Sequence, residues 1–405
     1  EVIGQGDNYK EKVKTGNYKE SLLPTSTSIN VRFQEKSINT PVYKLSELNP
    51  GFKISGPGII IDKFSTILIE PEFQAEINSF GHIILTQISK KQFHVGINKD
   101  PVMLEVFNKL FMNIAEQMGH ILTRTAHSVN IKERLDFSCA IFDQKGNLVA
   151  NAPHMPVHLG AMGESVKTII DENKKSMKQG DIFLINNPHR GGSHLPDLTV
   201  ISPVFSIEKT PVFFVASRGH HSDIGGITPG SMPAFGKSIQ DEGVIIDNFK
   251  LVSEGKFRSS ELIEVLSSGD YPARNIPERI ADAKAQVAAV HKGILETEKL
   301  IKKYGLKTVH AYMKYIRSNA SKAVRRALYK YLNGKEKMEL SFEDFLDSGE
   351  SIIVNIIIES GTQPPDSCRA IVDFTGTSSQ LESNLNAPVA VTKAAVLYVF
   401  RLMID

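Results

Sequence analysis

Short apolar runs separated by turn residues mark the first part of the chain with a regular pattern. Between positions 56 and 89 these runs alternate with Gly, Pro and Asn at close intervals, which is typical of a small β-meander. The pattern therefore predicts a β-rich N-terminal segment. Its expected strands are residues 59–61, 66–69, 75–78 and 83–88.

Helical periodicity follows. Asp100 and Pro101 form a favourable helix start, because aspartate caps free N–H groups and proline suits the first position. Apolar residues then recur every three or four positions and predict one long helix. Two further apolar stripes, in residues 282–303 and 309–332, flank Gly305. They predict an antiparallel helical hairpin that serves as scaffold or subunit contact.

Two apolar, β-branched runs in the middle of the chain predict a β-hairpin. They cover residues 198–205 and 211–216, with turn material between them. Antiparallel pairing would bring His194 and Asp197 beside residues 220–223, since directly opposed Cβ atoms lie roughly 5 Å apart. We predict an α+β protein, in which the β-rich segment precedes a mixed α/β domain containing the helical hairpin.

Polar residues gather at the open end of this hairpin. Six of the chain's 12 histidines lie between positions 154 and 221. Imidazole and carboxylate groups without a thiolate suit Mn²⁺, Mg²⁺, Zn²⁺ or Fe²⁺. In extended chain, His220 and His221 point to opposite faces, so only one of them can join the site, and Asp223 shares the face of His221. We assign metal binding to His194, Asp197 and His221, with the choice between the two histidines open; the alternative is a hydrogen-bonded polar cluster.

Other polar residues are candidates for the same site. Prolines hold the segment around His158 extended, so this histidine should lie on a loop that enters a helix near position 160. There it would be a further ligand or an acid–base group. Arg134 and Arg218 each have a planar guanidinium suited to a substrate carboxylate. For Arg134, an ion pair with Asp136 is an equally good interpretation.

Composition narrows the classes of protein and partner. The 405 residues allow two or three domains, and 41% hydrophobic and 23% charged residues are ordinary for a globular cytosolic protein. The net charge of +2 indicates neither a nucleic-acid nor a membrane-surface partner, and no apolar run reaches the ~18 residues of a membrane span. Cys139 and Cys368 show neither redox nor zinc spacing, so a reducing compartment is expected.

Long segments of the sequence resemble a known family. GGSHLPDLTVISPVF and ASRGHHSDIGGITPGSMP resemble the hydantoinase B half of the oxoprolinase and hydantoinase family. So do RTAHSVNIKERLDFSCAIFDQKGNLVANAPHMPVHLGAMGESV upstream and DFTGTSSQLESNLNAPVAVT downstream. The likeness implies two domains. Residues 1–92 would be a remnant of the hydantoinase A-like C-terminal β-rich region, and residues 93–405 a hydantoinase B-like domain truncated at its C-terminus.

The resemblance also implies an activity, the ATP-dependent hydrolytic opening of 5-oxo-L-proline to L-glutamate in cytosolic glutathione turnover. A divalent cation would polarise a carbonyl or activate water, with His158, Asp223 and Arg218 as catalytic groups and Arg134 as the substrate-binding residue. The alternatives are the B-type subunit of a hydantoinase or ketone carboxylase, and an inert fragment or assembly subunit.

ATP is expected to bind elsewhere. Gly236 and Lys237 match the pair of a phosphate-binding loop, but Ser231 stands where such a loop needs glycine, so we expect no nucleotide site in this chain. The ATP site would belong to a hydantoinase A-like ATPase half. The chain starts with Glu1 rather than Met, and we interpret it as part of a longer homo-oligomeric enzyme, inactive without that half.

Overall fold

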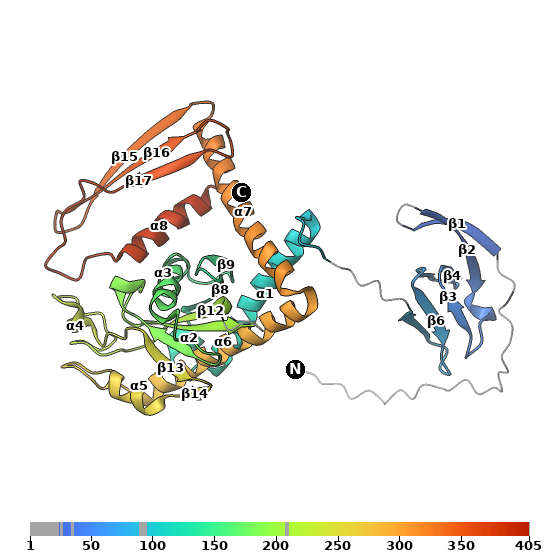
Figure 1. Ribbon diagram of the computed structural model, residues 1–405, viewed down its shortest axis with the longest axis horizontal. Coiled ribbons are helices and arrows are strands. Elements are labelled where there is room, and N and C mark those ends of the chain that lie inside the picture. The colour runs from blue at the N-terminus through green and yellow to red at the C-terminus, as the bar shows by residue number, and fades with distance from the viewer. Residues whose placement is uncertain (1–23, 25–26, 34–35, 89–94, 207–209, 405) are drawn as a thin grey trace, which may run out of the picture. The chain divides into compact units, whose positions relative to one another are not determined.

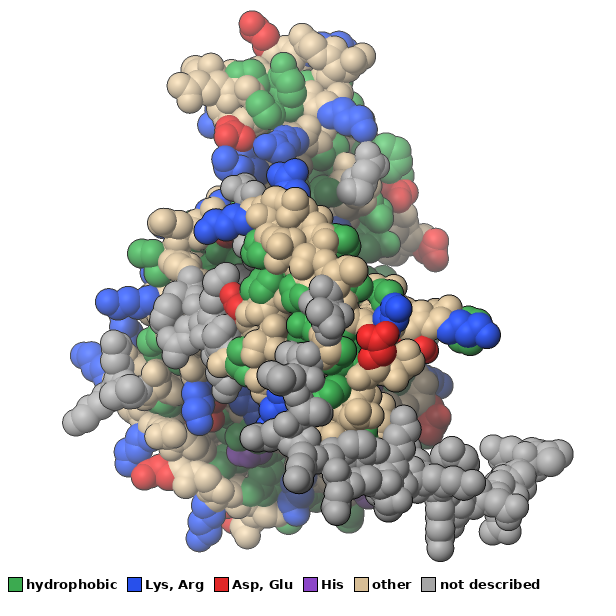
Figure 2. All heavy atoms as spheres, turned by 90° about the vertical axis from the view of Figure 1, so that its right-hand side faces the viewer, with side chains coloured by type: hydrophobic (Ala, Val, Ile, Leu, Met, Phe, Trp, Pro, Cys, Tyr) green, Lys and Arg blue, Asp and Glu red, His purple; other side chains and the backbone are tan. Residues whose placement is uncertain are grey.

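The computed structural model describes residues 24, 27–33, 36–88, 95–206 and 210–404 (Figure 1). The chain divides into two compact units, Glu1–His94 and Val95–Asp405. The predicted domain boundary at 92/93 lies outside the described residues. None of the described helices is both long and apolar enough to cross a membrane. On the face drawn in Figure 2, basic and acidic side chains are interspersed.

The N-terminal unit consists of two small sheets around one apolar core. Ile54, Ile60 and Ile69 are almost fully buried in it. All four strands predicted in this unit are confirmed to within two residues at each end. Strands β2 and β3 were not predicted; β2 is largely polar and pairs with both β1 and β4. The first sheet has the order β1 (Thr27–Phe33), β2 (Lys36–Lys44), β4 (Gly58–Ile61), β5 (Thr66–Ile69), and the second the order β3 (Lys53–Ser55), β6 (Phe73–Ile77), β7 (Ile83–Gln87).

The second unit is organised on a seven-stranded antiparallel sheet. The predicted hairpin is confirmed as β11 (Asp197–Phe205) and β12 (Pro211–His220), two of its central strands. Every residue of β11 is buried, which explains its continuous apolar and β-branched sequence. The full order is β14 (Lys256–Phe257), β13 (Phe249–Ser253), β10 (Ile182–Ile185), β11, β12, β8 (Phe137–Asp143), β9 (Leu148–Asn151).

Helices cover both faces of this sheet (Figure 1). On one face, α1 (Pro101–Thr125) and α6 (Ile276–Tyr304) pack against residues such as Ile141 and Val215. On the other, α3 (Pro156–Asn173) packs against their neighbours, including Phe142 and Phe214. The predicted start of α1 is confirmed, because the Asp100 carboxylate accepts the N–H of Met103 at 2.7 Å. Shorter helices are α2 (Val129–Lys132), α4 (Ile239–Glu242), α5 (Ser259–Leu266) and the 3-10 turns Leu45–Glu47 and Pro188–Arg190.

The two long helices predicted on either side of Gly305 are confirmed as α6 and α7 (Leu306–Leu332), and Gly305 takes a φ of +81° between them. Figure 1 shows them diverging from this bend, so the two helices do not pack antiparallel along their length as predicted. Helix α6 packs along β11 and β12, whereas α7 contacts a separate three-stranded sheet. That sheet consists of β15 (Lys337–Phe345), β16 (Ser351–Glu359) and β17 (Arg369–Asp373), and the last helix is α8 (Val389–Leu402).

Helix α8 packs on α3 at a glycine. A Cβ atom on Gly160 would lie 2.2 Å from the Cα of Ala394, whereas one on Gly163 would meet nothing closer than 3.7 Å. Gly160→Ala is therefore expected to push α8 from α3 and to cost about 1–3 kcal/mol of stability. Gly163→Ala is the matched control and should be neutral or slightly stabilising, since alanine favours the helix. Hydrogen exchange of the α8 amides measures the difference, and equal exchange in both variants would contradict it.

Candidate active site

The open end of the β11–β12 hairpin brings Asp197 and His220 directly opposite one another. The Nδ1 atom of His220 lies 2.8 Å from the Oδ1 atom of Asp197. Both side chains point to the α3 face of the sheet, as do the alternate residues Ile201 and Phe214. The Asp197 carboxylate is 5% exposed and the His220 ring 18% exposed, so this pair reaches the surface through the histidine.

A second imidazole reaches the same carboxylate from helix α3. His158 lies in the first turn of α3, which begins at Pro156, so the prediction of a loop up to position 160 was wrong. Its Nε2 atom is 3.5 Å from Asp197 Oδ1 and 3.9 Å from Asp136 Oδ1. Its Nδ1 atom is 3.2 Å from the hydroxyl of Ser138. We call Asp136, His158, Asp197 and His220 the Asp197 cluster.

His194 borders this cluster. Its ring centroid is 5.4 Å from that of His220. Its Nε2 atom is buried and finds no hydrogen-bond partner among the residues that the structure describes. Burial lowers the pKa of His194, against the charge of Asp197. The side chain therefore offers a neutral imidazole nitrogen to the cluster.

A buried arginine supports the other carboxylate oxygen of Asp197. Arg218 is fully buried and donates to the hydroxyls of Thr199 (2.7 Å), Ser193 (3.1 Å) and Ser165 (2.9 Å). The Ser193 hydroxyl in turn donates to Asp197 Oδ2 at 2.5 Å. Burial lowers the pKa of Arg218 to about 10, while the Asp197 charge opposes this. With its donors engaged inside the protein, Arg218 cannot receive a substrate carboxylate, so the catalytic role predicted for it was wrong.

These contacts decide the charge states of Asp197 and His220. Burial alone would raise the pKa of Asp197, but hydrogen bonds from His158 and His220 outweigh it and hold that pKa well below the usual range. Burial likewise would lower the pKa of His220, but the hydrogen bond and charge of Asp197 raise it overall. Asp197 is therefore a carboxylate that accepts the Nδ1–H of His220, and in the neutral ring the Nε2 atom carries the free lone pair.

The predicted choice of His221 was wrong. This ring lies on the opposite face of the sheet, where its Nε2 atom is 3.0 Å from Oε1 of Gln286 on α6. It is fully buried, and burial lowers its pKa to about 4. His220 takes the place expected for it, because Asp197 and His220 occupy opposed positions in the strand register.

Asp223 is a structural anchor, which corrects its predicted catalytic role. Its carboxylate accepts the N–H groups of Gly225, Gly230 and Arg274, each at 2.9 Å, and the Arg274 guanidinium at 2.9 Å. These bonds hold the glycine-rich loop after β12. Arg134 is exposed, and its charge reaches His220, whose pKa it acts to lower. No ion pair joins Arg134 to Asp136 within the described part of the chain.

Side chains that could act as metal ligands are present, but they are hydrogen-bonded to one another. Among the described residues, no group of three or more His, Cys, Asp or Glu side chains is arranged to hold a metal. Nitrogen and oxygen donors nevertheless meet at Asp197 Oδ1, and His194 Nε2 is unpaired beside them. These nitrogen and oxygen donors are of the types that divalent cations bind, but in this structure Asp197 and His220 are joined by a hydrogen bond.

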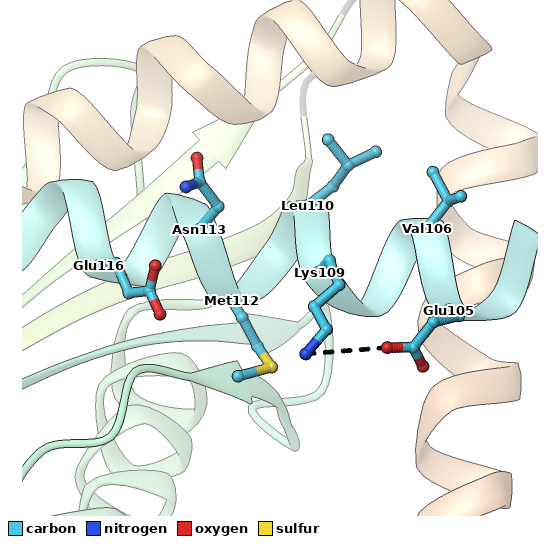
Figure 3. Close-up of a pocket in the computed structure, with 7 residues that line it drawn as sticks. All are labelled: Glu105, Val106, Lys109, Leu110, Met112, Asn113 and Glu116. Atoms are coloured by element: carbon cyan, nitrogen blue, oxygen red, sulfur yellow. Dashed lines mark ion pairs between the residues drawn. The ribbon is translucent and has the colours of Figure 1, made fainter.

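Two surface hollows lie away from the Asp197 cluster. The hollow in Figure 3, of about 560 Å³, lies on the outer face of α1, where Lys109 and Glu105 form an ion pair at 3.8 Å. The other, of about 610 Å³, lies between α3, α7, α8 and β17 and includes Lys167, Arg317 and Lys393. Neither hollow is lined by a residue of the Asp197 cluster, so neither is part of the candidate active site.

Sequence reasoning missed the residues that support Asp197. Ser193, Ser165 and Thr199 bind Arg218 from three separate segments, and no local pattern marks them. The register was also hidden from sequence, because a shift between Val204 and Phe205 places His220 opposite Asp197, where counting from the turn would place Gly219.

A family model described as hydantoinase B/oxoprolinase matches residues 100–405. The 5-oxoprolinase 1 of Arabidopsis thaliana is 44% identical over 387 residues, 91% of this chain and 30% of that protein. The 5-oxoprolinase of Dictyostelium discoideum is 45% identical over 371 residues, 91% of this chain and 28% of that protein. The chain thus spans under a third of the length of these relatives.

A solved structure shows the same fold. The ATP-dependent caprolactamase from Pseudomonas jessenii is similar with a TM-score of 0.64 and 22% identity, over 75% of this chain and 51% of that chain. At this identity the likeness establishes the mixed helix and sheet architecture, which agrees with the α+β prediction.

Proposed function

Because the chain belongs to the hydantoinase B/oxoprolinase family, we propose that it forms part of a 5-oxoprolinase, which opens 5-oxo-L-proline hydrolytically to L-glutamate with ATP. Relatives of that name are 44% and 45% identical over 91% of the chain. The structural observation that carries the proposal is the buried carboxylate of Asp197 with His158 and His220 at one oxygen. Such an arrangement suits proton transfer in amide hydrolysis.

His220 is the acid–base group of this proposal. Its Nδ1–H is held by Asp197, so the ring is oriented and its Nε2 atom is free to take a proton from an attacking water molecule. The water oxygen adds to the lactam carbonyl carbon, the ring C–N bond breaks, and the protonated His220 returns the proton to the leaving nitrogen. The raised pKa of His220 makes it a stronger base than a free imidazole.

Two further elements belong to the proposal. Arg134, exposed and within electrostatic reach of His220, would bind the substrate carboxylate. A divalent metal, Mn²⁺, Mg²⁺, Zn²⁺ or Fe²⁺, would be held by Asp197, His158 and His194. When bound, such an ion supplies Lewis-acid polarisation of the carbonyl or a lowered pKa of water.

The proposed setting is the cytosol and glutathione turnover. Both described cysteines, Cys139 and Cys368, are free and buried, which is compatible with a reducing compartment. ATP would be bound by a hydantoinase A-like ATPase half outside this chain, and the complete enzyme would be a homo-oligomer.

A substrate comparison tests the function. The polypeptide that carries this chain together with the ATPase half should form L-glutamate from 5-oxo-L-proline only in the presence of ATP, and residues 1–405 alone should form none. Glutamate is measured by chromatography, with hydantoin and acetone plus bicarbonate as competing substrates. Turnover of hydantoin or acetone instead would favour the B-type subunit of a hydantoinase or ketone carboxylase, and no turnover of any substrate would favour an inert assembly subunit.

A further inference from the structure

Four unpaired polar atoms belong to buried side chains on the α6 face of the large sheet. None has a hydrogen-bond partner in the described ranges, and each side chain is at most 1% exposed. Burial without a partner is unfavourable for any one such atom, and buried polar atoms in proteins are nearly always paired. Four together therefore require an explanation. They are Ser128 Oγ, His221 Nδ1, Arg279 Nε and Asp282 Oδ2.

Hydrogen bonds, helical spacing and electrostatic reach place the four side chains near one another on three segments. Asp282 Oδ1 accepts the backbone N–H groups of His127 at 2.7 Å and Ser128 at 3.2 Å, so Ser128 lies against this carboxylate. Arg279 is one helical turn before Asp282 on α6, and Gln286 is one turn after it. His221 contacts Gln286 at 3.0 Å and lies within electrostatic reach of both Asp282 and Arg279.

The hydrogen bonds of Gln286 fix which atoms can donate. Its Nε2 atom donates to the carbonyls of Leu198 (2.8 Å) and Ser217 (3.1 Å), so its Oε1 atom can only accept. His221 Nε2 therefore carries the hydrogen, and Nδ1 of the neutral ring is a bare acceptor. Asp282 Oδ2 is a second acceptor, Arg279 Nε is a donor, and the Ser128 hydroxyl is free to donate.

We propose that these four atoms form a binding site for one buried water molecule. The water donates its two hydrogens to His221 Nδ1 and Asp282 Oδ2, and it accepts hydrogen bonds from Arg279 Nε and the Ser128 hydroxyl. Two acceptors and two donors match the full hydrogen-bonding capacity of a single water, and buried waters typically make about three such bonds. A metal ion is disfavoured because the Arg279 N–H would face it, and an anion is disfavoured by Asp282.

This site ties the end of β12 to α6 immediately after His220. The water would join His221, the residue next to His220, to α6 and to the start of α2. It thereby fixes the strand end that presents His220 to Asp197. The inference concerns the fold and does not depend on the proposed function.

Ser128→Ala distinguishes a bonded hydroxyl from an unpaired one. If the hydroxyl bonds the water, its removal should raise the unfolding equilibrium constant of the chain about fivefold in urea titrations. If the hydroxyl is unpaired, its removal should leave stability unchanged or increase it, which would overturn the proposal. Helix capping does not confuse the result, because the Ser128 side chain makes no cap bond to α2.

The matched control is Thr228→Val. The Oγ1 atom of Thr228 is likewise buried and unpaired within the described residues, but it lies in the glycine-rich loop and outside this group. Its removal should be neutral or stabilising. A crystal structure of the native chain at about 1.5 Å should show one water within hydrogen-bond distance of all four atoms. Direct bonding of Ser128 Oγ to Asp282 Oδ2 with no density between the side chains would refute the site.

Discussion

Asp197→Asn is expected to reduce the ATP-dependent ring opening of the complete enzyme by about 10³- to 10⁴-fold per folded molecule, by analogy with the loss of a buried triad aspartate. The amide has nearly the same shape as the carboxylate but no charge. Its NH₂ group would face either the Ser193 hydroxyl or the Nδ1 atom of His220, both of which donate to Asp197 in the native protein. His220 would then lose its orientation and adopt the wrong tautomer for a base at Nε2.

The measurements are kcat and KM in steady-state assays, and bound metal by mass spectrometry after gel filtration. We expect kcat to fall far more than KM rises, and the variant to hold less metal than the native protein. Retention of more than a tenth of kcat would exclude the proposed role of Asp197. Unchanged metal content, or no metal in either protein, would remove the cation from the proposal and leave the Asp197–His220 pair as the acid–base device.

Asp181→Asn is the matched control for this experiment. The Asp181 side chain is fully buried like that of Asp197 and pairs with Lys250 at 2.8 Å, but it contacts no member of the cluster. Burial would raise the pKa of Asp181, yet the hydrogen bonds from Lys250 and from the backbone of Glu254 lower it overall. The variant should lose stability above the unfolded-state pKa of aspartate, near pH 4. Its kcat per folded molecule should match that of the native enzyme.

Arg218→Met is expected to destabilise the second unit by about 3–5 kcal/mol, the usual cost of removing one partner from a buried charge pair. The variant leaves the Asp197 carboxylate without the charge of Arg218, which acts together with His158 and His220 to lower its pKa. It also leaves the carbonyl of Gly191, which accepts from Arg218 at 3.0 Å, without that donor. Urea unfolding monitored by circular dichroism gives the change in free energy.

Two further arginine variants make the result specific. Arg134→Met alters an exposed side chain and should change stability by less than about 0.5 kcal/mol. Arg218→Lys keeps the charge but cannot reach all the acceptors of the guanidinium, so it should fold with an intermediate loss. If Arg218→Lys were as stable as the native protein and raised only KM, Arg218 would be a substrate ligand after all, and the burial argument would be wrong.

The local sequence pattern was sufficient to predict the hairpin, the start of α1 and the helices around Gly305. It was also sufficient to predict the part of the site that lies at the open end of the hairpin. The apolar runs of the hairpin, the Asp100–Pro101 helix start and the two stripes around Gly305 all depend on residues close together in sequence, whose periodicity reports a strand or a helix directly. The same hairpin pattern was enough to bring Asp197 to the end of β12, where His220 and His221 follow one another. Long segments shared with family members indicated the family for the same reason, because a sequence match can be recognised without knowing any tertiary contact.

The tertiary structure alone decided which of these side chains form the site. His158 arrives on α3 and Asp136 on the segment before β8, so their meeting with Asp197 depends on how separate elements pack. Arg218 and His221 are buried by α3 and α6 on opposite faces, and sequence does not state which helix covers which face. Asp223 is held by Arg274, 51 residues further along the chain. Charge, burial and partner are properties of contacts between distant residues, and these contacts exist only after the sheet and its two helical layers have assembled.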